Sequence, residues 1–399
     1  MNRVLALLCL LATPALADEV DAGLTDGGVV DEQREKDRLG GESAAALLGE
    51  TGIAGAFTLS GYAEAFYQWN FNQPADGVTD FRGFDNRHNS FTISNVALDV
   101  RWDFKRVIGR LALQVGHTPS TYYLAEPGLG GGSAANRTDA ELWKYLQQAN
   151  VGYSLDVGPG VLVEAGLFLS PIGPEAMQVK ENWNYSRSNL FFGLPYYHTG
   201  VRASAPVTER WSLTLAGYNG WNSVVDNNEG KSLALQATYT VPKKLAASLL
   251  YFGGIERSRG SAEGQPWRHL FDAHLTWVVS ERVSLLAHGN AGFEPNRLGT
   301  AWWAAGALYG RVQLVAWLFA AARVDAFFEG VPAGGTPLFW RAPFMSSQTL
   351  TLDARPHAQV SARLEYRHDE AGAPVFGTTS GPATAPRQDT LTLGLTTWF

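Results

Sequence analysis

Charged side chains occupy every second position near the C-terminal end of the chain. The stretch RLEYRHDE places Arg363, Glu365 and Arg367 on one parity. Alternate residues of an extended chain point to the same face of a sheet. We therefore expect a ladder of guanidinium and carboxylate groups that could orient dipolar or anionic solutes. Cross-strand ion pairs that brace the sheet account equally well for any single member. Two upstream stretches extend the ladder with Arg323, Asp325, Asp353 and Arg355.

Motifs that would indicate catalysis are missing from the sequence. It contains no nucleophile elbow, metalloprotease helix or phosphate-binding loop. The residues that come nearest to a metal-binding pattern are Asp272, His274 and His288, and two histidines on an inward face are the simpler interpretation. Ser90 beside His88 has no evident third partner for hydrolysis. We expect a protein that is not an enzyme and that holds no cofactor and no metal.

Period-two alternation of apolar and polar residues continues along most of the chain. In LTLGLTTWF, for example, Leu391, Leu393 and Leu395 alternate with small polar residues. Such alternation is typical of strands with one apolar face. Most of the candidate strands reach the ~9–11 residues that a tilted strand needs to cross a bilayer. We expect about sixteen strands, within a range of roughly 14 to 18. Their expected first residues are Phe57, Phe91, Val107, Tyr145, Val161, His198, Trp211, Lys231, Leu245, Trp267, Val283, Trp303, Trp317, Gln348, Gln359 and Asp389.

The expected connections alternate between long and short. Long segments such as residues 171–197 follow odd-numbered strands, whereas KR, GPG, TE and SE follow even-numbered ones. Long extracellular loops and short periplasmic turns are typical of outer-membrane barrels. The sequence therefore predicts an all-β fold, a transmembrane antiparallel up-and-down β-barrel. A soluble β-sandwich core is the alternative, but it does not explain why aromatic residues gather at the strand ends.

The N-terminal segments predict export. Residues 1–17 have the basic start, apolar centre and small-residue end of a signal peptide, and the single cysteine, Cys9, lies within them. Residues 18–52 hold ten acidic and three basic side chains, which predicts an acidic, flexible periplasmic lead-in. Residues 53–399 would form the barrel, and their near-neutral charge gives no support for nucleic-acid binding. We expect the protein in the outer membrane of a Gram-negative cell.

The long segment 171–197 differs from a solvated loop in its high apolar content. We expect it to fold into the barrel and narrow it, with an external loop or a subunit contact as the alternative. Its candidate constriction charges are Glu175, Lys180, Glu181 and Arg187.

Phe399, at the C-terminus, completes a stretch that resembles the assembly signal of outer-membrane barrels. The barrel-assembly machinery is therefore an expected partner.

Several stretches resemble the OmpL-like β-barrel porins. They are GLFLSPIGPE, SRS at 186–188, PYYHTGVR, NGWN, DNNEGKS, AARVDAFFEG and RLEYRHDE, over roughly residues 160–370. The resemblance implies a pore for small solutes without a cofactor. We therefore expect a passive porin whose partners are small solutes, ions and outer-membrane lipids, and a homotrimer is one possible assembly. A barrel-embedded hydrolase and an envelope scaffold or adhesin are the alternatives.

Overall fold

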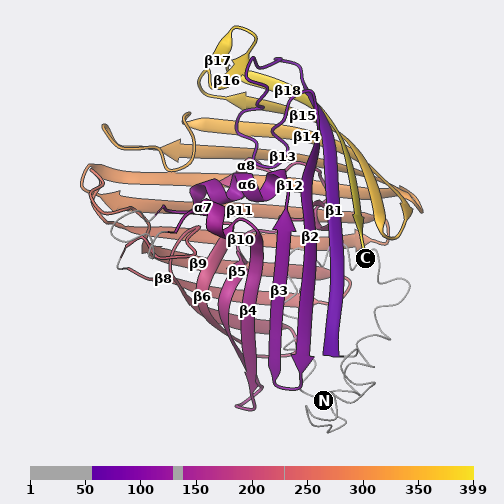
Figure 1. Cartoon of the computed structure of the whole chain (residues 1–399), viewed down its shortest axis with the longest axis vertical. Coiled ribbons are helices and arrows are strands. Elements are labelled where there is room, and N and C mark those ends of the chain that lie inside the picture. The colour runs from indigo at the N-terminus through magenta and orange to yellow at the C-terminus, as the bar shows by residue number, and fades with distance from the viewer. Residues whose placement is uncertain (1–55, 129–137, 229) are drawn as a thin grey trace.

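The computed structural model describes residues 56–128, 138–228 and 230–399. The expected signal peptide (1–17) and lead-in (18–52) lie outside the described residues. Sixteen antiparallel strands form a closed barrel in the order β1-β18-β15-β14-β13-β12-β11-β10-β9-β8-β7-β6-β5-β4-β3-β2. In Figure 1 the front strands β1–β4 run upright and the strands behind them run across, as opposite walls of a tilted barrel do. The barrel strands are β1 (Phe57–Asn70), β2 (Ser90–Phe104), β3 (Val107–Val115), β4 (Leu146–Leu155), β5 (Val161–Leu169), β6 (Tyr197–Pro206), β7 (Trp211–Tyr218), β8 (Ser232–Val241), β9 (Leu245–Ile255), β10 (Trp267–Ser280), β11 (Val283–Asn296), β12 (Gly299–Val315), β13 (Leu318–Gly330), β14 (Phe344–His357), β15 (Val360–Ala371) and β18 (Arg387–Trp398).

The remaining described elements are short and lie in the long connections. They are α6 (His117–Tyr122), η1 (Tyr123–Ala125), α7 (Ala140–Trp143), η3 (Val179–Glu181), α8 (Asn189–Phe192) and the separate hairpin of β16 (Phe376–Thr378) with β17 (Gly381–Ala385). Within the described ranges, no helix has the length and apolar character needed to cross a bilayer.

The expected strands agree closely with the observed ones, and the predicted barrel of sixteen antiparallel strands is confirmed. Two strands begin four residues earlier than expected. β12 starts at Gly299 rather than Trp303, and β14 starts at Phe344 rather than Gln348. The added residues read GTAW and FMSS, in which apolar and polar residues do not alternate, so the period-two pattern does not mark these strand ends. The expected long loop between β11 and β12 is consequently wrong, because only residues 297–298 separate the two strands.

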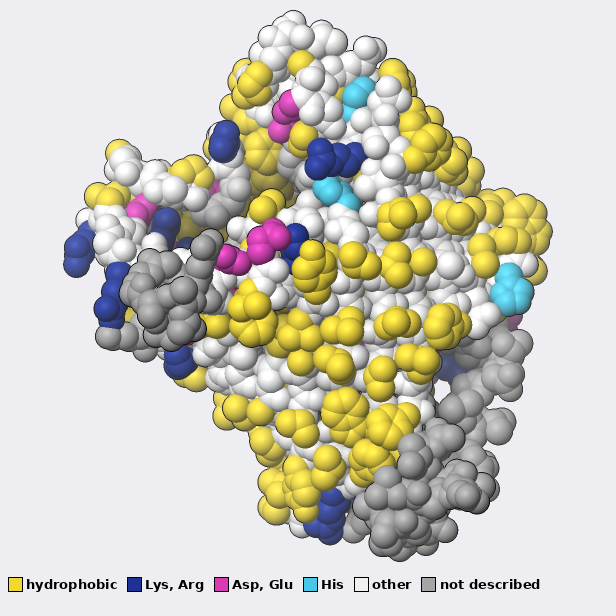
Figure 2. Space-filling model, in the orientation of Figure 1, with side chains coloured by type: hydrophobic (Ala, Val, Ile, Leu, Met, Phe, Trp, Pro, Cys, Tyr) yellow, Lys and Arg dark blue, Asp and Glu magenta, His cyan; other side chains and the backbone are white. Residues whose placement is uncertain are grey.

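The outer surface of the barrel is apolar and its inner surface is polar. On β18, Leu391, Leu393 and Leu395 are 40–55% exposed. Their neighbours Thr390 and Thr392 are buried in the interior. Figure 2 shows hydrophobic side chains spread over the strand wall that faces the viewer, with charged groups gathered toward its ends. A closed barrel with an apolar exterior places lipid against the outer side chains.

The barrel closes where β1 pairs with β18. Phe399 extends this pairing, because it exchanges two backbone hydrogen bonds of 3.1 Å with Gly61. Its ring lies over Gly61 on the lipid-facing side and is 63% exposed. The last residue of the chain therefore takes part in barrel closure at the end that carries the short turns.

Candidate functional site

The predicted charge ladder lies on the inner face of β13, β14 and β15. Its charges form short ion pairs along the wall, between Arg323 and Asp325 (3.3 Å) and between Arg363 and Asp353 (3.2 Å). Arg355 also binds Asp353, at 3.0 Å. All members except Arg355 are at most 5% exposed. The ladder therefore braces the wall, and most of it has no open access to solvent.

The connection between β5 and β6, residues 170–196, covers this ladder, and we call it the β5–β6 loop. Arg363 donates hydrogen bonds to the backbone oxygens of Val179 (2.8 Å) and Asn184 (3.2 Å). Arg323 donates to the backbone oxygen of Ser186 (2.6 Å). The guanidinium groups thus satisfy loop carbonyls that a barrel interior would otherwise leave without partners.

The carboxylates of the ladder bind the same loop through its backbone N–H groups. Glu365 accepts hydrogen bonds from the amides of Tyr185 and Ser186, the latter at 2.9 Å. Asp325 accepts from both the backbone and the side-chain nitrogens of Asn189, at 3.2 and 2.8 Å. The guanidinium groups of the wall therefore bind carbonyl oxygens of the loop, and the carboxylates of the wall bind N–H groups of the same loop.

The four candidate constriction charges lie in two different environments. Glu175 pairs with Arg323 at 3.1 Å and accepts from the Ser188 amide at 3.0 Å. Arg187 is buried and donates to loop carbonyls, including that of Tyr185 at 3.1 Å. Lys180 and Glu181 form a pair of 3.5 Å and keep 20% and 24% of their side-chain surface exposed. The structure therefore brings Glu175 and Arg187 into the contact between loop and wall and leaves Lys180 and Glu181 more open.

Apolar side chains of the β5–β6 loop pack against both ends of the covered wall. Trp183 and Leu190 join a buried cluster with Tyr309 on β12 and its neighbours on β11 and β13. Val179 and Tyr185 pack against Phe66 on β1. The ring of Tyr185 also fills the space above Gly394 on β18. The loop therefore lies over the arc of wall that runs from β11 through β13–β15 and β18 to β1.

The rest of the inner wall, from β2 to β9, carries pairs of polar side chains. Arg202 donates to Glu164 at 2.6 Å and stacks on the ring of Phe168. Ser204 and Thr214 form a hydrogen bond of 2.8 Å across β6 and β7. This arc therefore carries charge pairs and hydroxyl groups, although Ile172 and Leu194 near the two ends of the loop also pack on apolar side chains of β7–β9.

Aromatic residues from several long connections meet at the end of the barrel that carries these connections. Phe339 lies between β13 and β14, and Trp221 lies between β7 and β8. The ring centroid of Phe339 is 5.8 Å from that of Trp221 and 5.1 Å from that of Trp303 on β12. Trp340 continues the ring contacts to Phe81, between β1 and β2, at 5.6 Å. We call Phe81, Trp221, Trp303, Phe339 and Trp340, together with the connections that hold them, the aromatic lid. It ties together loops from opposite sides of the barrel.

Buried glutamates hold the connections that form the lid. Glu329 on β13 accepts hydrogen bonds from the successive amides of Leu338, Phe339 and Trp340. Glu126 accepts from the Val224 amide at 3.0 Å, and burial raises the pKa of this carboxyl. Glu329 has the inward parity of β13, but the loop amides that both glutamates bind follow no period, so the sequence does not reveal these contacts.

Asp272, His274 and His288 are neighbours on β10 and β11, as their parity predicts. His288 Nε2 lies 2.7 Å from Asp272, and His274 Nδ1 lies 3.6 Å from it. Asp272 also accepts a hydrogen bond of 3.2 Å from the Gly173 amide at the start of the β5–β6 loop. Among the residues that the structure describes, no group of three or more His, Cys, Asp or Glu side chains could hold a metal ion. Asp272 therefore anchors the start of the loop, and the two histidines contact this carboxylate.

A family model described as "Putative beta-barrel porin-2, OmpL-like" matches residues 56–399. The chain belongs to this family. The match is wider than the region that carried the resemblance in the sequence and includes every barrel strand. Membership of the OmpL-like porins identifies the barrel as an outer-membrane porin in general terms. A search among curated proteins found no match.

Solved porin structures share the fold at low sequence identity. An anion-selective porin from Comamonas acidovorans is 12% identical, with a TM-score of 0.57, 86% of this chain covered and 99% of the other. In-vitro folded OmpT, an outer-membrane protein of Vibrio cholerae, is 8% identical, with a TM-score of 0.55 and coverages of 86% and 97%. OprB of Pseudomonas putida, in a high-pH structure, is 11% identical, with a TM-score of 0.54 and coverages of 88% and 97%. At these identities the likeness shows that this OmpL-like chain has a porin fold.

Proposed function

We propose that the protein is a passive diffusion channel for small hydrophilic solutes and ions, narrowed by its β5–β6 loop. The observation that carries this proposal is the match between the β13–β15 ladder and the loop backbone. Buried charged groups are costly unless they are paired and hydrogen-bonded. Five charged side chains of the ladder hold this one loop against the wall, which supports a functional role for the position of the loop.

The proposed path follows the β2–β9 side of the interior. This wall offers water-compatible groups, including the Arg202–Glu164 pair and the Ser204–Thr214 pair. Lys180 and Glu181 are the loop charges that we assign to the narrow part of the path, because they keep more exposed surface than Glu175 or Arg187. The aromatic lid would restrict the extracellular entrance.

We also propose the remaining features of an exported porin. Residues 1–17 would direct export, residues 18–52 would form a periplasmic lead-in, and residues 53–399 would be the barrel. Phe399 would contribute to recognition by the barrel-assembly machinery. A homotrimer is the assembly that we propose, since one solved relative of this fold, OmpT of Vibrio cholerae, is described in a trimer form.

A catalytic role has little support among the described side chains. Ser170 Oγ lies 3.1 Å from His198 Nε2, but the other nitrogen of this ring contacts the backbone oxygen of Gly220 at 3.0 Å. His198 is fully buried, and burial without a carboxylate partner disfavours the imidazolium that would form if the ring took the serine proton. We therefore propose that the protein is not an enzyme.

Reconstitution in planar bilayers tests the proposal. The mature protein, purified from outer membranes, should give stepwise conductance in potassium chloride. A variant that replaces residues 176–187 by a short Gly-Ser linker should give larger steps if the β5–β6 loop narrows the path. Heat-modifiable migration in electrophoresis would show that both proteins are folded barrels. A folded protein without conductance would overturn the channel, and equal steps for both proteins would overturn the narrowing.

A further inference from the structure

A pair of aromatic side chains lies on the outer wall at the short-turn end of the barrel. Trp211 on β7 and Tyr239 on β8 are directly opposite each other in the strand register, and their ring centroids are 4.9 Å apart. Trp211 is 41% exposed. Tryptophan and tyrosine favour the boundary between hydrocarbon and water, because the ring is apolar and its polar group can reach the lipid headgroups. The pair therefore marks the level of the headgroups on the periplasmic side.

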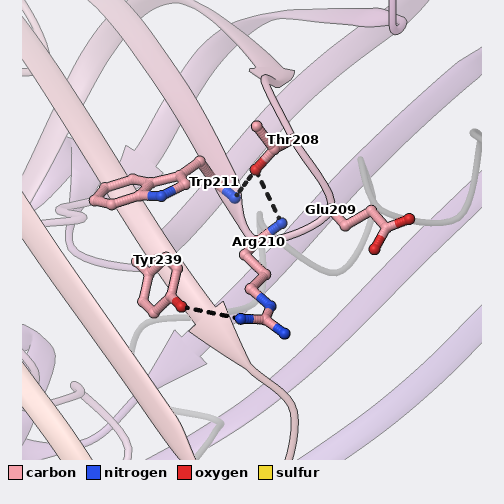
Figure 3. A pocket seen from close by; sticks show the side chains of 5 residues that line it. All are labelled: Thr208, Glu209, Arg210, Trp211 and Tyr239. Atoms are coloured by element: carbon pink, nitrogen blue, oxygen red, sulfur yellow. Dashed lines mark hydrogen bonds between the residues drawn. The ribbon is translucent and has the colours of Figure 1, made fainter.

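Arg210 lies next to this pair, in the short turn between β6 and β7. Its guanidinium donates a hydrogen bond of 3.4 Å to the Tyr239 hydroxyl (Figure 3). The Thr208 hydroxyl oxygen fixes the turn, because it accepts from the amides of Arg210 (3.2 Å) and Trp211 (3.0 Å). The backbone oxygen of Arg210 also accepts from the Thr240 amide, at 2.9 Å. These contacts hold the backbone of Arg210 beside the two rings.

Glu209 places a negative charge on the other side of the same turn. Figure 3 shows the two rings to one side of Arg210 and the Glu209 carboxylate to the other. In the part of the chain that the structure describes, neither of these exposed charged side chains takes part in an ion pair. Together with Thr208, Trp211 and Tyr239 they line an open pocket of about 520 Å³. The pocket thus presents, in this order, an aromatic surface, a cation and an anion.

The neighbouring short turn adds positive charge to the surroundings of the pocket. This turn joins β8 to β9 and carries the exposed residues Lys243 and Lys244. Glu209 is the only acidic residue in the two turns, which span 207–210 and 242–244. The surroundings therefore favour an anionic group at Arg210, and Glu209 is the one group in these turns that favours a cation.

Apolar side chains continue from the aromatic pair into the hydrocarbon layer. On the outer face of the wall, Ala237 of β8 lies opposite Leu213 of β7 on one side and Leu249 of β9 on the other. The two leucines are 43% and 58% exposed. Ala237 is two residues from Tyr239 in the strand, so it shares the same face. An acyl chain that starts at the aromatic pair can therefore stay in contact with protein as it enters the membrane.

We propose that this pocket binds a phospholipid with an ethanolamine headgroup from the periplasmic leaflet of the outer membrane. Arg210 binds the phosphate oxygens, for which a guanidinium has the matching planar geometry. Glu209 accepts hydrogen bonds from the ammonium group, and the aromatic pair contacts the glycerol and the start of an acyl chain. From hydrocarbon to water, the lipid and the pocket present their apolar and charged groups in the same order. The site adds a lipid ligand to the barrel and does not depend on the proposed channel.

Native mass spectrometry of the detergent-released barrel tests the site. We would add palmitoyl-oleoyl phosphatidylethanolamine at increasing concentration and measure the dissociation constant of the first bound lipid. Arg210→Gln should bind this lipid about fivefold more weakly, because it loses an exposed charge contact with the phosphate. Heat-modifiable migration in electrophoresis would show that the variant is a folded barrel. Equal affinity in Arg210→Gln and the native protein would overturn the site.

Arg106 provides the matched control. It lies in the short turn between β2 and β3, and its side chain is 53% exposed but already paired with Asp156. Arg106→Gln removes one positive charge at the same end of the barrel, as Arg210→Gln does, and should leave lipid affinity unchanged. An equal loss of affinity in the two variants would show that the lipid responds only to net charge, which would overturn a local site.

Glu209→Gln tests the headgroup. Phosphatidylglycerol carries the same phosphate without an ammonium group, so the native protein should bind it more weakly than phosphatidylethanolamine. Glu209→Gln should remove this preference, because the carboxylate that distinguishes the two headgroups is lost. Equal affinity of the native protein for both lipids, or a preference that survives in Glu209→Gln, would overturn the ethanolamine site. Lipid binding without conductance would keep the site and overturn the channel, and conductance without lipid binding would do the reverse.

Discussion

Glu365 of the barrel wall accepts hydrogen bonds from two successive backbone amides of the β5–β6 loop, those of Tyr185 and Ser186. The same carboxylate accepts from the hydroxyl of Thr351 at 2.7 Å on the neighbouring strand. A buried carboxylate with three donors is well satisfied, whereas its removal leaves those donors without partners. Glu365 is therefore a point where the loop can be loosened by one substitution.

We expect Glu365→Ala to raise the single-channel conductance and to make it more variable. Each buried amide left unsatisfied costs about 1–3 kcal/mol, so the loop should leave the wall part of the time. Planar-bilayer recordings measure the effect. Glu281→Ala is the matched control, because Glu281 is exposed in the short turn between β10 and β11. A conductance that stays native in Glu365→Ala would show that this contact does not hold the loop.

Gly394 offers an independent way to displace the loop. A Cβ atom at this position would lie 2.2 Å from a ring carbon of Tyr185, so Gly394→Val should expel that ring from the wall. We expect faster proteolysis of residues 176–187 and a higher conductance. Gly217→Val is the control, since a Cβ there meets no atom within 4 Å. If the two variants behave alike, the contact of Tyr185 with β18 is unimportant.

The sequence predicted the strands well because period-two alternation is a local signal. Lipid on one side and polar groups on the other fix each strand independently of its partners. Parity also predicted the charge ladder, with bracing of the wall and an action on solutes both left open. It did not predict that Arg363 and Arg367 donate hydrogen bonds to backbone oxygens of the β5–β6 loop. A backbone carbonyl is present at every residue, so no residue type in the loop could reveal this match.

The lid shows a second limit of prediction from sequence. Phe339 and Trp221 are far apart in the chain and lie in connections without periodicity. Their contact depends on where the barrel places the ends of β7 and β13, which is a property of closure and strand tilt. By contrast, the high apolar content of residues 171–197 was a sufficient signal that this loop needs a surface to pack against.

Acid should weaken one contact of the lid. Glu263, between β9 and β10, accepts from the Ser261 hydroxyl and, at 2.7 Å, from the amide of Thr336 between β13 and β14. These hydrogen bonds lower the pKa of Glu263 from 4.5 to about 2. A carboxyl with a lowered pKa stabilises the folded state above its unfolded pKa, and this contribution is lost as the pH falls through the folded pKa. We expect the contact to weaken between about pH 4.5 and 2.

Hydrogen exchange of residues 331–343, corrected for the intrinsic rate at each pH, measures this weakening. Protection should fall over that pH interval in the native protein. In Glu263→Gln it should already be low at neutral pH and change little with acid. Unchanged protection down to pH 2 in the native protein would contradict the assignment of the contact to the ionised carboxylate.

The ring of Phe399 packs on Gly61 where the barrel closes. A Cβ at position 61 would lie 2.2 Å from a ring carbon of Phe399, so Gly61→Val should force the terminal ring away from β1. Overpacking of this kind costs about 1–3 kcal/mol, and the urea midpoint of unfolding in detergent should fall.

Phe399→Ala removes the ring and should reduce the amount of assembled barrel in cells. In the double variant the clash is absent, so Gly61→Val should cost much less in the Phe399→Ala background. Equal costs in both backgrounds would show that the ring of Phe399 does not pack on Gly61.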